Sequence, residues 1–190
     1  MNNLPDFDIE QNGEISRVFL SRNILTFHQA IEFIRNLNYG RNLNKGDLKT
    51  VFTDNKGTCS TKHAVLKQLA HENHFDDINL MLGVFKMNAK NTPKVAETLT
   101  EYNLKYIPEA HNYLKYKLEI FDFTKPNVSS FDFVNDLFFE TEIQPNEIAG
   151  RKVQIHRGFL VNWLNENSDI EYSLDEIWRI REQCIQNLSE

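Results

Sequence analysis

The chain has 190 residues, of which 41% are hydrophobic and 12% are aromatic, and its formal net charge is -6 at pH 7. A chain so rich in apolar residues can bury a substantial core, which excludes a disordered protein, and its length fits one ordinary domain. The acidic balance argues against binding of nucleic acid through bulk charge. We therefore expect a folded domain without a nucleic-acid partner.

The amino end and the hydropathy of the chain predict its compartment. Residues 1–6 have neither a basic start nor an apolar stretch, so we expect no signal peptide. No run approaches the ~18 apolar residues that a membrane span needs, so no membrane partner is expected. Without a visible export signal, Cys59 and Cys184 are expected to be reduced thiols. The sequence thus predicts a cytoplasmic protein.

The first half of the chain predicts mainly helices and loops. The lead-in, residues 1–22, is expected to be irregular with a short strand around residues 15–20. A helix is predicted over about residues 25–37, with Thr26 as its N-cap, because apolar residues recur there at helical spacing. Residues 39–46 include many that tolerate turns, so this segment is predicted to be a loop.

The middle of the chain predicts a helix, a buried strand and a hairpin. Residues 60–73 follow a helical pattern, and residues 78–87 form a nearly unbroken apolar run, which is typical of a strand covered on both faces. Two strands follow at about residues 110–116 and 119–123, close enough in the chain to pair as a hairpin.

Further helices are predicted on either side of this hairpin. Thr92 precedes a proline and is expected to cap a helix that ends near Tyr102. Ser173 and Glu176 form a capping-box signal for a last helix. A helix is also predicted over residues 153–164. The residues of that helix predicted to face the core are Ile155, Phe159, Leu160, Trp163 and Leu164.

Cys59 is the first residue that suggests chemistry, because it lies between a break at Gly57-Thr58 and the start of the helix over residues 60–73. The dipole and the free N–H groups of a helix N-terminus favour an anion, so a thiolate is stabilised there. The same N–H groups can bind the oxyanion that forms when a thiolate attacks a carbonyl. Gly57 lets a substrate backbone approach closely. The alternative is that Cys59 is a small buried residue without a reaction to perform.

The predicted hairpin brings a histidine and an aspartate to one face. A tight turn between its strands sets Tyr113 opposite Asp122 and His111 opposite Thr124. Because side chains alternate along a strand, His111, Tyr113 and Asp122 then project from the same face. His111 and Asp122 become diagonal neighbours, ~7–8 Å apart at the backbone, within reach of an imidazole–carboxylate hydrogen bond.

Thiol catalysis needs this arrangement of groups. A histidine takes the proton of the thiol and later returns a proton to the leaving amine, while an aspartate holds the imidazole ring in the productive orientation. The alternative is that His111 is a half-exposed strand residue and Asp122 a surface charge near the turn.

The order of these residues resembles that of the transglutaminase-like family of the papain-related superfamily, bacterial type. The segments that carry the resemblance are Gly57-Thr58-Cys59-Ser60-Thr61-Lys62-His63-Ala64, Ile107-Pro108-Glu109-Ala110-His111-Asn112-Tyr113 and Phe121-Asp122-Phe123-Thr124. The resemblance covers about residues 39–125 and implies Cys59 as nucleophile, His111 as general base and acid, and Asp122 as the orienting carboxylate. No side chain that completes an oxyanion hole is identified.

The resemblance implies an α+β fold, in which the cysteine-bearing helix packs on an antiparallel sheet and extra C-terminal helices cover the remaining face or edge. No repeat, low-complexity tract or linker divides the chain. We therefore expect a single transglutaminase-like domain over residues 1–190, with a core of about 25–125 and a C-terminal extension of about 126–190.

The function that the resemblance implies is thiol-dependent acyl transfer, or hydrolysis of an amide or peptide bond, through a thioester intermediate. Its expected substrate is a peptide, a protein or a small amide. The family also holds inactive members, so a non-catalytic binding module and a small-molecule acyltransferase remain as alternatives. The oligomeric state is left open.

Other residues around this segment are candidates for substrate binding. Arg41, in the loop before the cysteine, suits a substrate carboxylate or carbonyl. His63 lies one helical turn after Cys59 and either lines the cleft, tunes the thiolate or packs behind the site. The residues predicted to bind substrate are Arg41, Gly57, Thr58, His63 and Tyr113.

Neither a metal nor a cofactor is predicted. His71 and His74 lie three residues apart near a helix end and lack the spacing of a zinc-protease helix, so a solvated helix terminus is expected there. Cys184 lies on the apolar stripe of the last helix and is expected to belong to the core.

Overall fold

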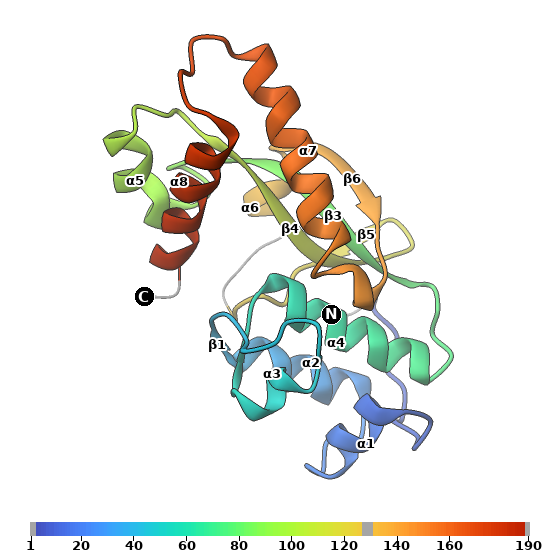
Figure 1. Cartoon of the computed structure of the whole chain (residues 1–190). Helices are drawn as coiled ribbons and strands as arrows, with labels where there is room; N and C mark the ends of the chain where they lie inside the picture. Colours follow the sequence, from blue (N-terminus) through green and yellow to red (C-terminus); the bar gives the residue numbers. More distant parts are fainter. Residues whose placement is uncertain (1–2, 127–130, 189–190) are drawn as a thin grey trace.

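The fold, taken from a computed structural model that describes residues 3–126 and 131–188, is α+β (Figure 1). Its centre is a four-stranded antiparallel sheet in the order β5-β4-β3-β6. The α+β class and the antiparallel sheet predicted from the sequence are therefore confirmed. The strands of this sheet are β3 (Ile78–Met87), β4 (Ile107–Tyr116), β5 (Glu119–Phe121) and β6 (Leu137–Glu142).

The N-terminal helices gather below the sheet in Figure 1. They pack with one set of β3 side chains, Leu80, Leu82 and Val84, in a continuous apolar cluster. A short parallel pair, β1 (Asn38–Tyr39) and β2 (Lys56–Gly57), closes the loop that precedes the longest of these helices. The helices are α1 (Glu14–Leu20), α2 (Phe27–Asn36), α3 (Thr50–Thr53) and α4 (Cys59–Glu72).

The later helices form a second apolar cluster with the alternate side chains of β3, which include Met81, Phe85 and Met87. Because neighbouring residues of a strand point to opposite faces, β3 contributes side chains to both clusters, which explains its nearly unbroken apolar sequence. The elements of this part are η1 (Pro93–Val95), α5 (Ala96–Glu101), α6 (Phe131–Val134), η2 (Pro145–Glu147), α7 (Arg151–Glu166) and α8 (Leu174–Asn187).

Several sequence predictions are confirmed by these elements. The hydroxyl of Thr26 accepts a hydrogen bond from the N–H of Gln29 at the start of α2, and β3 spans the predicted residues. The hairpin has the predicted register, since Leu114 faces Phe121. The turn between β4 and β5 contains Lys117 at φ 55°, a left-handed conformation that a two-residue hairpin turn requires. Ser173 caps α8 as predicted.

The prediction of a strand over residues 15–20 is wrong, because the segment forms α1. The carboxylate of Glu72 accepts hydrogen bonds from the N–H groups of Ile15 and Ser16, at 3.2 and 2.7 Å. A Cβ on Gly13 would lie 2.0 Å from Cδ of Glu72, so only glycine leaves room for this contact. The acceptor for the first N–H groups of α1 thus comes from α4, 56 residues away from Ser16. A local sequence pattern cannot predict such a distant partner.

Two predicted boundaries also need correction. The hydroxyl of Thr92 makes no capping hydrogen bond but donates to Oδ1 of Asn91, and the segment after it begins as a 3-10 turn before α5. The strand predicted to reach residue 123 ends at Phe121, so Asp122 lies just beyond the ladder. None of the helices within the described residues is long and apolar enough to cross a membrane.

Gly83 offers a test of the packing above β3. A Cβ there would lie 2.6 Å from Cδ2 of Leu137 and 3.0 Å from Cε1 of Tyr113. We expect Gly83→Ala to lower the free energy of unfolding by about 1–3 kcal/mol, because the added methyl overpacks this face. Gly158→Ala, on the exposed side of α7 with no heavy atom within 4 Å, should instead raise it by up to ~1 kcal/mol. Denaturant unfolding of both variants measures the contrast, and equal changes would contradict this packing.

Candidate active site

Cys59 is the first residue of α4 and is 8% exposed. The first N–H groups of a helix have no partner within it, so its thiol lies where these donors gather. The parallel pairing of Tyr39 with Gly57 brings the ring of Tyr39 beside the same point. Cys59 therefore lies at a helix N-terminus, as the sequence predicted.

His111 and Asp122 lie in contact. Nε2 of His111 is 2.8 Å from Oδ2 of Asp122, whose side chain is 1% exposed. The other carboxylate oxygen accepts the N–H and the hydroxyl of Thr124, at 2.9 and 2.5 Å. Burial alone would raise the pKa of Asp122, but the charge and hydrogen bond of His111 hold it well below its usual range. Asp122 is therefore ionised, and it leaves Nδ1 of His111 for another partner.

Cys59 and His111 form an ion pair at neutral pH. Burial raises the pKa of the Cys59 thiol, but the charges of Lys152 and His111 outweigh it, together with a hydrogen bond from His111, and lower the pKa to about 6. Burial lowers the pKa of His111, but the charges of Asp122 and Cys59 outweigh it and raise the pKa to about 10. Between these values the sulfur is a thiolate and the ring an imidazolium.

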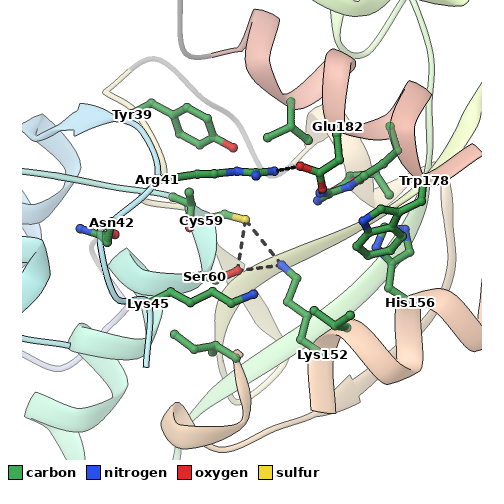
Figure 2. Close-up of a pocket in the computed structure, with 16 residues that line it drawn as sticks. Tyr39, Arg41, Asn42, Lys45, Cys59, Ser60, Lys152, His156, Trp178 and Glu182 are labelled. Carbon is green, nitrogen blue, oxygen red and sulfur yellow. Dashed lines mark hydrogen bonds and ion pairs between the residues drawn. The ribbon is translucent and has the colours of Figure 1, made fainter. Parts of the chain in front are cut away.

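Lys152, at the start of α7, is the residue of the site that sequence reasoning missed. Its buried Nζ lies 3.9 Å from Sγ of Cys59 and donates to Oγ of Ser60 at 2.8 Å (Figure 2). It also donates to Oδ1 of Asn112 at 2.8 Å. The amide nitrogen of Asn112 donates to the carbonyl of Met81, which turns the amide oxygen toward the ammonium. Burial lowers the pKa of Lys152, but the charges of Cys59 and Glu109 oppose that shift. Its nitrogen is thus held beside the sulfur by neutral acceptors.

A signal for Lys152 exists in the sequence, but it is weak. The buried residues of α7 are Lys152, His156, Leu160 and Trp163, which recur every three or four residues. The predicted core face included Leu160 and Trp163 but started at Ile155, which is only half buried. A lysine and a histidine in line with an apolar stripe indicate buried polar groups, although not where they point.

His63 lies behind the site rather than in it. Its Nε2 accepts the N–H of Phe123 at 2.8 Å, so the ring is neutral and Nδ1 donates to the carbonyl of Cys59, also at 2.8 Å. Burial lowers the pKa of His63 to about 4. The ring is fully buried and lines neither of the two cavities that adjoin Cys59. The predicted substrate contact is therefore corrected to a positioning role.

Two further predicted substrate contacts are also placed elsewhere. A Cβ on Gly57 would lie 2.9 Å from Cγ of Lys62, so the glycine makes room for packing against Lys62 rather than for a substrate. Tyr113 is fully buried, and its hydroxyl donates to Glu140. Arg41 and Thr58, in contrast, line a cavity at Cys59, so their contact with a substrate stays a prediction.

Two cavities share Cys59 as a wall. The first, of about 240 Å³, has a charged lining that includes Lys152 (Figure 2). The second, of about 260 Å³, is mostly apolar and contains His111 and Asp122 in its wall. A substrate that occupies both cavities would pass over the sulfur. The residues common to both linings are Tyr39, Cys59, Glu109 and Ile185.

The remaining candidates do not join this site. Cys184 is a free, buried thiol of α8, and burial raises its pKa to about 11. His71 is exposed and pairs with Asp76 at 2.6 Å. Within residues 3–126 and 131–188, no three side chains of the kinds that bind metals lie together.

Comparison of the chain with protein-family models, with curated proteins and with solved structures found no match in any of the three.

The pKa of Cys59 gives a test of its surroundings. We expect the ultraviolet absorbance of the thiolate to rise with a midpoint near pH 6, since the Cys184 thiol titrates only near 11. Lys152→Met removes an amine whose charge lowers the pKa of Cys59, and it should raise that pKa by about 1–3. The matched control is Lys67→Met, because Lys67 is also a buried lysine but binds the carbonyl of Asp76. An unchanged midpoint in Lys152→Met would contradict the assigned role.

The pKa values of His63 and His111 should differ in opposite directions from that of an ordinary imidazole. NMR of the ring protons should give a midpoint near pH 4 for His63 and near 10 for His111, because the first is desolvated and the second faces two anions. The His111→Gln variant assigns the second signal. A His111 midpoint near that of an ordinary imidazole would show that the ion pair does not form.

Proposed function

We propose that the protein catalyses acyl transfer or hydrolysis of an amide or peptide bond through a thioester on Cys59. The observation that carries this proposal is the orientation of the His111 ring between Asp122 and Cys59. Nε2 of His111 is held by the buried Asp122, so Nδ1 is the nitrogen that serves the thiol at the N-terminus of α4. The pair lies where two cavities meet, which gives a substrate access to both groups.

The proposed fold family is the transglutaminase-like core of the papain-related superfamily. Three features support it: the cysteine begins a helix that packs on an antiparallel sheet, the histidine lies on β4, and the aspartate follows β5. The order of the three residues along the chain is also that of the family resemblance. These features support the roles of the three catalytic residues, but they do not identify the substrate.

The proposed first half-reaction follows from these positions. The thiolate of Cys59 attacks the carbonyl carbon, and the carbonyl electrons move to oxygen. The first N–H groups of α4 and the ammonium of Lys152 stabilise this oxyanion, which supplies the side chain that sequence analysis lacked. His111 then gives its proton to the leaving nitrogen, the C–N bond breaks, and a thioester on Cys59 remains.

In the second half-reaction, water or an amine attacks the thioester. His111 takes the proton of the nucleophile, the carbon–sulfur bond breaks and the thiolate forms again. Asp122 stays ionised throughout and keeps the ring aligned, because its carboxyl cannot move without losing the bonds from Thr124. We propose hydrolysis as the leading reaction, since no residue is assigned to hold an amine acceptor.

The test is acyl-enzyme formation from activated esters and peptide anilides, followed by intact-mass measurement and by release of the leaving group. We expect a mass increase on Cys59 that is absent in Cys59→Ser, and a fall in rate on the order of 10³-fold or more in Asp122→Asn. His71→Ala is the matched control, because it removes an exposed histidine–aspartate pair of similar length.

The same experiment separates the alternatives. Turnover in water alone indicates a hydrolase, and turnover only with an added amine indicates an acyltransferase. A thiol that takes up no acyl group from any donor, with the same ordinary reactivity in His111→Ala, would indicate a non-catalytic module and end the proposal.

A further inference from the structure

The first cavity contains more positive than negative charge. Among the described residues of its lining, four side chains are cationic, two are carboxylates, and Cys59 adds a thiolate. Burial lowers the pKa of His156, so that ring adds no charge at neutral pH. One positive charge is therefore left over. The charged side chains are Arg41, Lys45, Lys152, Arg181, Glu109 and Glu182.

The arginines of the cavity are already neutralised. Arg181 donates hydrogen bonds to both carboxylate oxygens of the buried Glu109, and it donates another to Glu182 at 2.6 Å. Arg41 pairs with the other oxygen of Glu182, as the dashed line in Figure 2 shows. Because both guanidinium groups are engaged by carboxylates, neither carries the surplus charge.

The surplus charge is the ammonium of Lys45. In the part of the chain that the structure describes, it has no hydrogen bond and no ion pair, although its side chain extends along the first cavity (Figure 2). Lys45 is an exposed residue, yet desolvation of its ammonium lowers its pKa, and the charges of Lys152, Arg181 and Arg41 lower it further. A single bound anion would relieve this repulsion, and one surplus charge matches a carboxylate better than a doubly charged phosphate.

The two cavities also differ in which half of a substrate they suit. His111, the proton donor for the leaving nitrogen, lines the second cavity only, whereas Lys152 lines the first. The leaving amine must lie near His111, so it falls on the side of Phe85, Met87 and Phe133. The acyl group then lies on the opposite side of the sulfur, in the charged cavity.

We propose that the first cavity is an acyl-donor subsite selective for donors that carry a carboxylate, which Lys45 binds, and that the second cavity receives an apolar leaving amine. This inference rests on the proposed function. Its substrate class is an amide of a dicarboxylic acyl group, such as a succinyl or glutaryl amide of an apolar amine.

The experiment compares two alkylating reagents of nearly equal size, anionic iodoacetate and neutral iodoacetamide. In each reaction the Cys59 sulfur bonds to the methylene carbon and iodide leaves. We expect the ratio of the iodoacetate rate to the iodoacetamide rate to be about tenfold higher for Cys59 than for free cysteine. Lys45→Gln should remove most of this preference, and added salt should weaken it.

Lys94→Gln is the matched comparison, because Lys94 is an exposed lysine that lines the second cavity instead. Its ratio should stay close to that of the unmodified protein. Fast iodoacetamide labelling with the same ratio in Lys45→Gln, or a larger fall in Lys94→Gln, would overturn this inference and leave the proposed function standing. Slow iodoacetamide labelling below neutral pH would overturn both.

Discussion

The buried charge of Asp122 constrains the rest of the site. Removing a carboxylate from water costs several kcal/mol even after relaxation, so its neighbours must return that energy through hydrogen bonds and an opposite charge. His111 and Thr124 do so directly. His111 comes from β4, and Thr124 from the segment after β5. One desolvated carboxylate thus fixes the position of that segment relative to β4.

The helix that begins at Cys59 is fixed to the same segment by two consecutive side chains. Lys62, fully buried, donates to the carbonyls of Thr124 and Leu37, at 2.8 and 2.6 Å. His63 joins the carbonyl of Cys59 to the N–H of Phe123. Hydrogen bonds from these two buried side chains to backbone groups therefore fix the position of the sulfur relative to His111 and Asp122.

The C-terminal helices are part of the site as well as a cover for the sheet. α7 contributes Lys152, whose ammonium lies beside the sulfur. α8 contributes Arg181, whose guanidinium donates hydrogen bonds to Glu109. Lys152, Arg181 and Glu182 of the first cavity lie beyond residue 125, where the family resemblance stops, whereas Arg41, Lys45 and Glu109 lie within it. A chain with a net charge of -6 thus builds a locally positive cavity, since the field at a site depends on its nearest groups.

The amino-acid sequence alone determined the elements that depend on local periodicity and turn chemistry. The helix after Cys59, the apolar strand over residues 78–87 and the register that aligns His111 with Asp122 are of this kind, because each follows from residues less than about fifteen positions apart. Only the tertiary structure decided what lies around them. Glu72 at the start of α1 and Lys152 beside the sulfur are contacts between distant parts of the chain, 56 and 93 residues apart. Such contacts form when packing brings two elements together, and the residues on either side carry no local pattern that names their partner.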